Sequence, residues 1–175
     1  MKKIIPIFFV LLLIFVIYKY NVDKKIKYLY IGNDVYYKYN EIMKSYYNSK
    51  QNIEYIRNDD YRVMDLINEI KCNHTIENKK IQNVLIKSNV IVLNVGLYDI
   101  EYKKELNYNY VDELIADIEK LLTIIRKYNK DKIYVLGFNN KNKYYEYLNS
   151  KLEIICRSKK IIYIDIEKSI VNQLY

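Results

Sequence analysis

Three aspartates at the ends of short apolar runs carry the groups most able to do chemistry. Asp34, Asp99 and Asp165 each lie at or just beyond the end of such a run, and Lys168 follows Asp165 by three residues. A carboxylate can act as a nucleophile or a metal ligand, and a lysine can act as a base if burial lowers its pKa by several units. The spacing therefore allows acid–base chemistry or, if the three carboxylates converge, a cation site.

The same residues also have ordinary structural explanations. Asp34 comes before a helical pattern, where an aspartate is a preferred N-cap. The single histidine, His74, lies in a polar stretch, and we expect it in a surface loop. We predict no metal and no cofactor, with the three-carboxylate cation site as the open alternative.

The two cysteines, Cys72 and Cys156, lack the spacing of a zinc site or a redox pair. They are either two ordinary thiols or, if the domain lies outside the cytoplasm, the halves of one disulfide.

Five apolar runs separated by helical patterns must position these residues. The predicted strands are Tyr28–Ile31, Ile53–Ile56, Asn89–Val95, Ile133–Leu136 and Ile161–Ile166. The helical patterns between them run over 35–46, 63–70, 81–85, 111–125 and about 142–157. Parallel strands need crossovers of helix length, so the order βαβααβαβαβ predicts a three-layer α/β/α domain with a five-stranded parallel sheet.

All three glycines of the chain come just after predicted strands. Gly32, Gly96 and Gly137 lie where ligand crevices form in parallel α/β folds. The alternative is that they only permit tight turns from strand to helix.

The segments at these strand ends resemble the motifs of the SGNH (GDSL-type) hydrolase family. Tyr30–Asp34 (YIGND) looks like the family's GDS block, and Asn94–Asp99 (NVGLYD) looks like its GxND block. Ile164–Lys168 (IDIEK) falls where the family has its terminal DxxH, and Tyr61–Leu66 is similar to the segment after its second-block glycine. The resemblance runs in order from Lys27 onward and implies a flavodoxin-like hydrolase fold.

The resemblance implies a serine nucleophile, a histidine base oriented by an aspartate, and an oxyanion hole. In this sequence Asp34 stands at the nucleophile position, Lys168 at the base position and Asp165 at the orienting position. The oxyanion-hole positions hold Asp60, Gly96 and Tyr98, where the family has Gly, Gly and Asn. The expected crevice lining is Gly32, Asn33, Asp99 and Gly137. Of the family's pattern, Gly32, Gly96, Asp99 and Asp165 match.

An apolar segment over residues 4–18 precedes the domain. It follows Lys2 and Lys3 and is closed by Lys19, and no small-x-small cleavage pattern comes after it. It is shorter than a full span of about 20 residues, but its place at the amino terminus is typical of an export signal. We expect an uncleaved single-pass anchor and linker over residues 1–26 and a domain over residues 27–175. Lysines flank both sides, and we expect the domain outside the cell because long domains translocate largely regardless of charge.

The net charge of +8 does not indicate a nucleic-acid partner, because the lysines form separate pairs without an arginine cluster or a recognised motif.

Two functions stay open. The first is a non-catalytic binding or scaffolding module at the cell surface that recognises a glycan or an acylated ligand. The alternative is an active esterase or acyl hydrolase with a non-standard site around Asp34, Asp165 and Lys168. The missing Ser and His favour the first.

Overall fold

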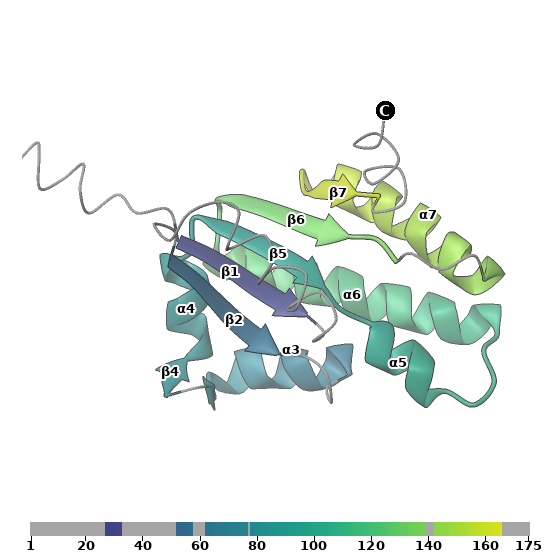
Figure 1. Ribbon diagram of the computed structural model, residues 1–175, viewed down its shortest axis with the longest axis horizontal. Coiled ribbons are helices and arrows are strands. Elements are labelled where there is room, and N and C mark those ends of the chain that lie inside the picture. Colours follow the sequence, from purple (N-terminus) through teal and green to yellow (C-terminus); the bar gives the residue numbers. More distant parts are fainter. Residues whose placement is uncertain (1–26, 33–51, 58–61, 77, 139–141, 166–175) are drawn as a thin grey trace, which may run out of the picture.

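The computed structural model describes residues 27–32, 52–57, 62–76, 78–138 and 142–165. It contains a five-stranded parallel sheet with the strand order β2-β1-β5-β6-β7 (Figure 1). The strands are β1 (Lys27–Gly32), β2 (Asn52–Arg57), β5 (Val90–Asn94), β6 (Lys132–Leu136) and β7 (Ile162–Ile164). All five predicted strands are confirmed, and with them the α/β class and the parallel sheet.

Four of the described helices form one layer against the sheet. They are α3 (Val63–Cys72), α4 (Ile81–Lys87), α6 (Tyr108–Tyr128) and α7 (Lys143–Ser158). The long helix α6 contacts each of the other three. Right-handed crossovers place them on one face, because the chain moves in one direction across the sheet from β2 to β7. The helix expected over 35–46 lies outside the described residues.

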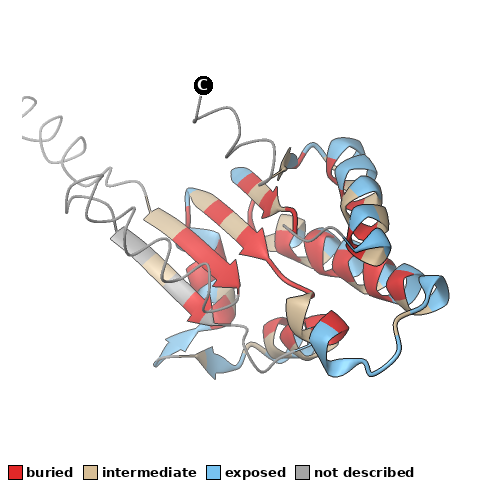
Figure 2. Ribbon diagram, turned by 45° about the vertical axis from the view of Figure 1, so that its right-hand side comes forward, coloured by how far each residue is buried: buried red, intermediate tan, exposed pale blue. Residues whose placement is uncertain are grey.

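The core lies between this helical layer and two rows of sheet side chains. One row consists of Leu29, Ile91 and Ile133, and the next consists of Ile31, Leu93 and Val135. All six are buried, and the apolar face of α6 packs with them in one cluster (Figure 2). Each fully buried Leu or Ile contributes about 1.5–3 kcal/mol relative to an exposed one. The core therefore fixes where the strands end and where the loops begin.

Two short elements were not predicted. A small antiparallel hairpin, β3 (Thr75–Ile76) and β4 (Lys79–Lys80), follows α3, and the short helix α5 (Leu97–Tyr102) follows β5. His74 precedes the hairpin and is exposed, as expected, with its Nδ1 2.8 Å from a Glu69 carboxylate oxygen.

Both cysteines are free thiols. Cys72 is exposed at the end of α3 and Cys156 is buried in α7, so the disulfide alternative does not describe this structure.

Within the described residues, no helix is both long and apolar enough to cross a membrane. The proposed anchor at residues 4–18 lies outside them.

Candidate functional site

The carboxyl edge of the sheet brings the first two sequence motifs side by side. Gly32 ends β1 and is the register partner of Asn94, which ends β5. A Cβ at Gly32 would lie 2.8 Å from the Asn94 carbonyl oxygen and 2.8 Å from the Tyr30 hydroxyl. Only glycine allows these three groups to approach so closely. Gly32 therefore does more than permit a turn: it makes room for a tyrosine hydroxyl at the end of the central strands.

Asn94 is the residue of this edge that the sequence reasoning did not single out. Its side chain is 1% exposed, and neither its amide oxygen nor its amide nitrogen has a hydrogen-bond partner among the described residues. A buried amide left without partners costs about 1–3 kcal/mol, so such groups in native proteins call for an explanation. The signal in the sequence was a polar residue inside the β-branched run Asn89–Val95.

Gly96 and Tyr98 shape the loop that follows β5. Gly96 has a φ of 104° and precedes α5, a backbone conformation that favours glycine. Tyr98 is half-buried on α5, where its ring stacks on that of Tyr102 with 5.7 Å between the centroids. Tyr102 is 67% exposed. The expected oxyanion position Tyr98 thus belongs to a tyrosine pair that lies partly on the surface.

Asp99 makes a structural contact with the start of α3. One of its carboxylate oxygens accepts a hydrogen bond from the Val63 amide at 3.1 Å, and its carbonyl oxygen accepts one from the Tyr110 hydroxyl at 2.8 Å. The Val63 amide begins a helix and has no partner within it. Burial raises the pKa of Asp99, although the hydrogen bond from Val63 and the nearby Arg62 oppose the shift. Asp99 therefore joins α5 to α3.

Gly137 and Asp165 lie at the ends of the last two strands. The Gly137 amide donates to the Ile164 carbonyl at 2.9 Å, and Asp165 follows directly after Ile164. Burial raises the pKa of Tyr163, and the carboxylates of Asp165 and Glu153 raise it further. Asp165 is thus a half-buried carboxylate that influences a tyrosine of its own strand.

The described aspartates do not form one site. Asp99 follows β5 and Asp165 follows β7, with β6 between them, so their strands lie roughly 10 Å apart at the usual strand spacing. Among the residues that the structure describes, no group of three His, Cys, Asp or Glu could hold a metal ion. The predicted site residues Asn33, Asp34, Asp60 and Lys168 lie outside the described part of the chain.

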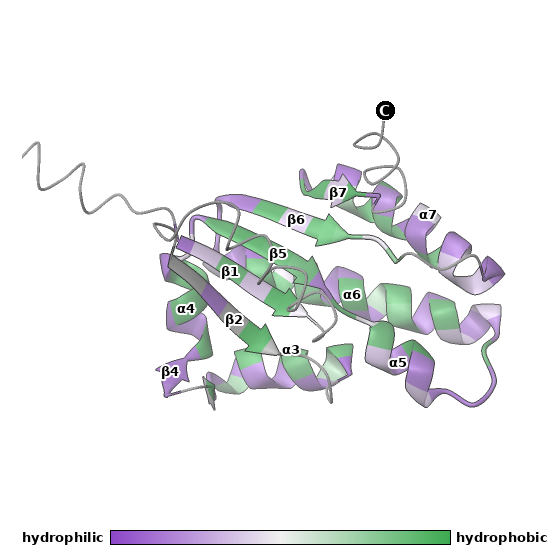
Figure 3. Cartoon of the chain, in the orientation of Figure 1, coloured by the Kyte–Doolittle hydropathy of each residue, from purple (hydrophilic) through white to green (hydrophobic). Residues whose placement is uncertain are grey.

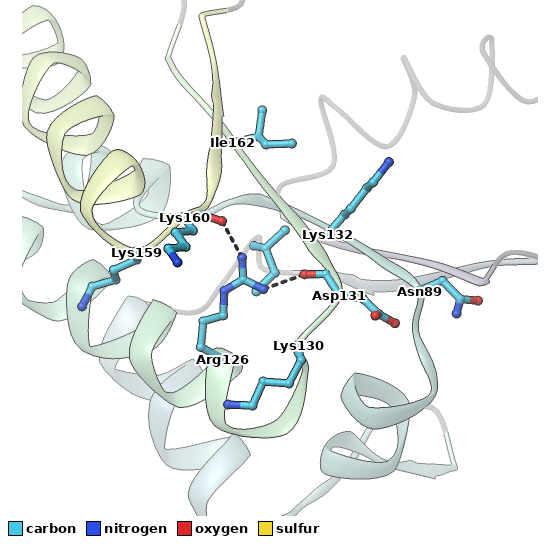
Figure 4. A pocket seen from close by; sticks show the side chains of 9 residues that line it. Asn89, Arg126, Lys130, Asp131, Lys132, Lys159, Lys160 and Ile162 are labelled. Atoms are coloured by element: carbon cyan, nitrogen blue, oxygen red, sulfur yellow. Dashed lines mark hydrogen bonds between the residues drawn. The ribbon is translucent and has the colours of Figure 1, made fainter.

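A pocket lies at the opposite, amino edge of the sheet (Figure 4). Its volume is about 600 Å³, and the connections that lead into β6 and β7 line it. The lining contains five cations, Arg126, Lys130, Lys132, Lys159 and Lys160, and one carboxylate, Asp131. The sequence alone does not reveal this pocket, because Lys159–Lys160 is only one of several separate lysine pairs along the chain. The available signal was that basic residues precede two successive strands.

A solved structure of an acetyl xylan esterase is similar to this chain, with a TM-score of 0.53 and 12% sequence identity. The match covers 82% of this chain and 79% of that one. The two share a fold. The N-terminal part of a Bacteroides fragilis protein with a phosphatase domain also matches, at a TM-score of 0.49 and 10% identity over 81% of this chain and 40% of that one. No protein-family profile and no curated protein sequence matches. The chain shares the fold of that esterase structure, and a fold does not by itself establish an activity.

Proposed function

We propose that the chain is a membrane-anchored SGNH/GDSL-hydrolase-like protein whose domain binds an acylated glycan without hydrolysing it. The observation that carries the proposal is the meeting of Gly32 and Asn94 at the carboxyl edge. These residues belong to the segments that resemble the first and third blocks of the family. In such folds ligands bind outside the carboxyl ends of the strands.

The lack of hydrolysis follows from the residue types at the reacting positions. A serine nucleophile needs a base that takes its proton, and the two positions hold Asp34 and Lys168 instead. At the described carboxyl edge the Asp99 carboxylate accepts a hydrogen bond from the Val63 amide of α3, so Asp99 does not replace the missing base. At these positions the domain therefore lacks the groups that would form and resolve an acyl-enzyme.

Two groups at this edge suit an acylated sugar. The Asn94 amide, which has no partner among the described residues, offers both a donor and an acceptor, and these match the carbonyl of an ester and the hydroxyls of a sugar. The stacked pair Tyr98 and Tyr102 offers an aromatic face with polar tips, and such faces pack against sugar rings. The similar structure is that of an acetyl xylan esterase, which suggests an acetylated polysaccharide as the first ligand to test.

The proposed anchor places this binding at a membrane surface. Residues 4–18 are apolar and uncharged, and residues 19–26 link them to β1. An uncleaved anchor would hold the domain outside the cell, where cell-surface polysaccharides are found.

The test measures binding and turnover with one preparation of the full chain in mild detergent. Calorimetry with acetylated xylan oligosaccharides should show binding that is lost when the acetyl groups are removed. Asn94→Leu keeps the size but removes the amide, and we expect at least about tenfold weaker binding, the equivalent of about 1.4 kcal/mol. Asn83→Leu, on the exposed side of α4, is the matched control and should leave binding unchanged.

Hydrolysis of p-nitrophenyl acetate by the same preparation decides between the two functions. We expect the wild type and Asp34→Ala to show the same background rate, with or without divalent metal. Turnover that disappears in Asp34→Ala would instead establish an esterase built on a carboxylate. Equal binding of acetylated and deacetylated oligosaccharides would exclude an acyl-specific site.

A further inference from the structure

The amino edge of the sheet carries a rigid basic pocket that no part of the proposed glycan site uses. We propose that this pocket binds the phosphate groups of anionic lipids and docks the domain on the membrane that its anchor enters. The inference rests on the anchor in the proposed function but not on the glycan site, which lies at the opposite edge of the sheet.

The pocket is strongly positive. Its five cations and one carboxylate give the lining a net charge of +4. Among the described residues, the Lys159 ammonium has an acidic partner, Glu119, at 3.1 Å. Lys130, Lys132 and Lys160 are exposed, and Figure 3 shows hydrophilic residues at the amino ends of β1 and β6. Such a cluster attracts phosphate groups strongly at short range.

Hydrogen bonds hold the pocket walls in place. The Arg126 guanidinium donates to two backbone carbonyls, that of Asp131 at 2.5 Å and that of Lys160 at 2.7 Å (Figure 4). One side chain thus joins the α6–β6 connection to the α7–β7 connection. The lysines extend from a fixed frame, so little backbone order has to be gained when they bind an anionic surface.

The α6–β6 connection is also fixed to the α4–β5 connection on its other side. The buried Asn129 amide donates to the Leu85 and Ser88 carbonyls, both at 2.7 Å, and its oxygen accepts from the Asp131 amide at 2.8 Å. Asn89 then joins the start of β5 to Lys27, the first residue of β1, by two hydrogen bonds. The frame therefore extends from the pocket to the point where the chain comes from the anchor.

The position of β1 explains why a membrane is the partner. Parallel strands all begin at the same edge, so Lys27 shares the amino edge with the pocket. Eight residues, 19–26, separate Lys27 from the apolar segment, and they can span at most about 28 Å. The amino edge is thus held close to the bilayer, where each cation strengthens association with an anionic surface about fivefold.

The experiment compares lysine reactivity in two membranes. The full chain is reconstituted into vesicles of phosphatidylcholine alone or of phosphatidylcholine with phosphatidylglycerol, and surface amines are acetylated and located by mass spectrometry. We expect Lys130, Lys132 and Lys160 to react several-fold more slowly when phosphatidylglycerol is present. Lys103 and Lys104, exposed between α5 and α6 near the other edge, should react equally in both. At about 1 M salt, where the Debye length is about 3 Å, the difference should vanish.

Charge reversal tests the same contact. In Lys130→Glu/Lys132→Glu the protection of Lys160 should be lost, because the removal of two cations weakens association by about twenty-five-fold or more. In the matched variant Lys103→Glu/Lys104→Glu, Lys160 should stay protected from acetylation.

Three results would overturn the inference, each in a distinguishable way. Equal reactivity in both membranes would mean that the pocket does not bind anionic lipid. Equal protection by free inorganic phosphate in detergent would assign the pocket to a soluble anion. If the chain washed off the vesicles, the proposed anchor would be refuted together with the docking. If the chain stayed on the vesicles but its lysines were unprotected, only the docking would be refuted.

Discussion

The buried carboxylate of Asp99 allows two substitutions with different expected outcomes. Asp99→Ala removes the acceptor of the Val63 amide and leaves the first turn of α3 with an unpaired buried donor. Such a loss costs about 1–3 kcal/mol, and in a chain of this size each kcal/mol lowers Tm by roughly 2–4 °C. Asp99→Asn keeps an oxygen for the Val63 amide and removes the buried charge. We expect it to be at least as stable as the wild type at neutral pH.

The pH dependence of stability follows from the direction of the pKa shift. Burial raises the pKa of Asp99 in the folded protein, so between the ordinary pKa and the raised one the folded state binds the proton more tightly than the unfolded state. This tighter proton binding contributes to the free energy of unfolding. The contribution is fully present below the ordinary pKa of an aspartate, about 3.9, and is lost as the pH rises through the raised pKa of Asp99. Asp99→Asn should lack this decline.

Urea denaturation, followed by far-ultraviolet circular dichroism in mild detergent at a series of pH values, measures the free energy of unfolding. The wild type, Asp99→Ala and Asp99→Asn are compared in this way. If Asp99→Asn were as unstable as Asp99→Ala at pH 7, the negative charge itself would be required at the start of α3. An Asp99→Ala variant as stable as the wild type would refute the structural role, and a role for Asp99 in ligand binding would then have to be tested.

The remaining predictions concern the loop glycine, the amino-edge frame and the thiols. The Gly96→Ala substitution should lower the free energy of unfolding by about 1–2 kcal/mol, because the φ of Gly96 is positive and a Cβ there would lie 3.3 Å from the Ile118 side chain. Chemical denaturation measures this change, and an unchanged midpoint would show that the backbone adapts to the added Cβ. Asn129→Ala should cost about 2–3 kcal/mol, since it leaves two buried carbonyls without their donor, and an unchanged midpoint would contradict this. Cys72 should react with a maleimide in the native protein, whereas Cys156 is buried and burial raises its pKa to about 12, so it should react only after unfolding. Early labelling of both would show that α7 opens readily.

The strands could be predicted because their signal is local. The β-branched run Asn89–Val95 is typical of a strand in a parallel sheet, and β5 forms within it, with Ile91 and Leu93 buried and Val90 and Val92 half-buried. The hairpin of β3 and β4 was missed because each strand has two residues, too few for any alternation to show. Helix α5 was missed because it has six residues, too few to show helical spacing, and its first three lie in the segment that resembles the GxND block.

The candidate site was less predictable because its contacts join distant parts of the sequence. The sequence placed Asp99 at the crevice, but nothing local reveals that its carboxylate accepts a hydrogen bond from an amide 36 residues earlier. Asn94 was visible as a polar residue in an apolar strand, but the absence of a partner for its amide among the described residues depends on the packing of β1 beside it. The basic pocket arises because the sheet brings together two connections, and Arg126 and Lys160 are 34 residues apart.

The way Arg126 binds its partners has a consequence for how this protein can change over time. Both of its acceptors are main-chain carbonyls, which every amino acid supplies. Residue 131 can therefore be replaced by other types, and residue 160 by types that tolerate its left-handed backbone (φ 55°), without breaking the link between the two connections. The charge displayed there is independent of the architecture beneath it, so a sequence family could alter the surface that this edge recognises while the same arginine keeps the edge intact.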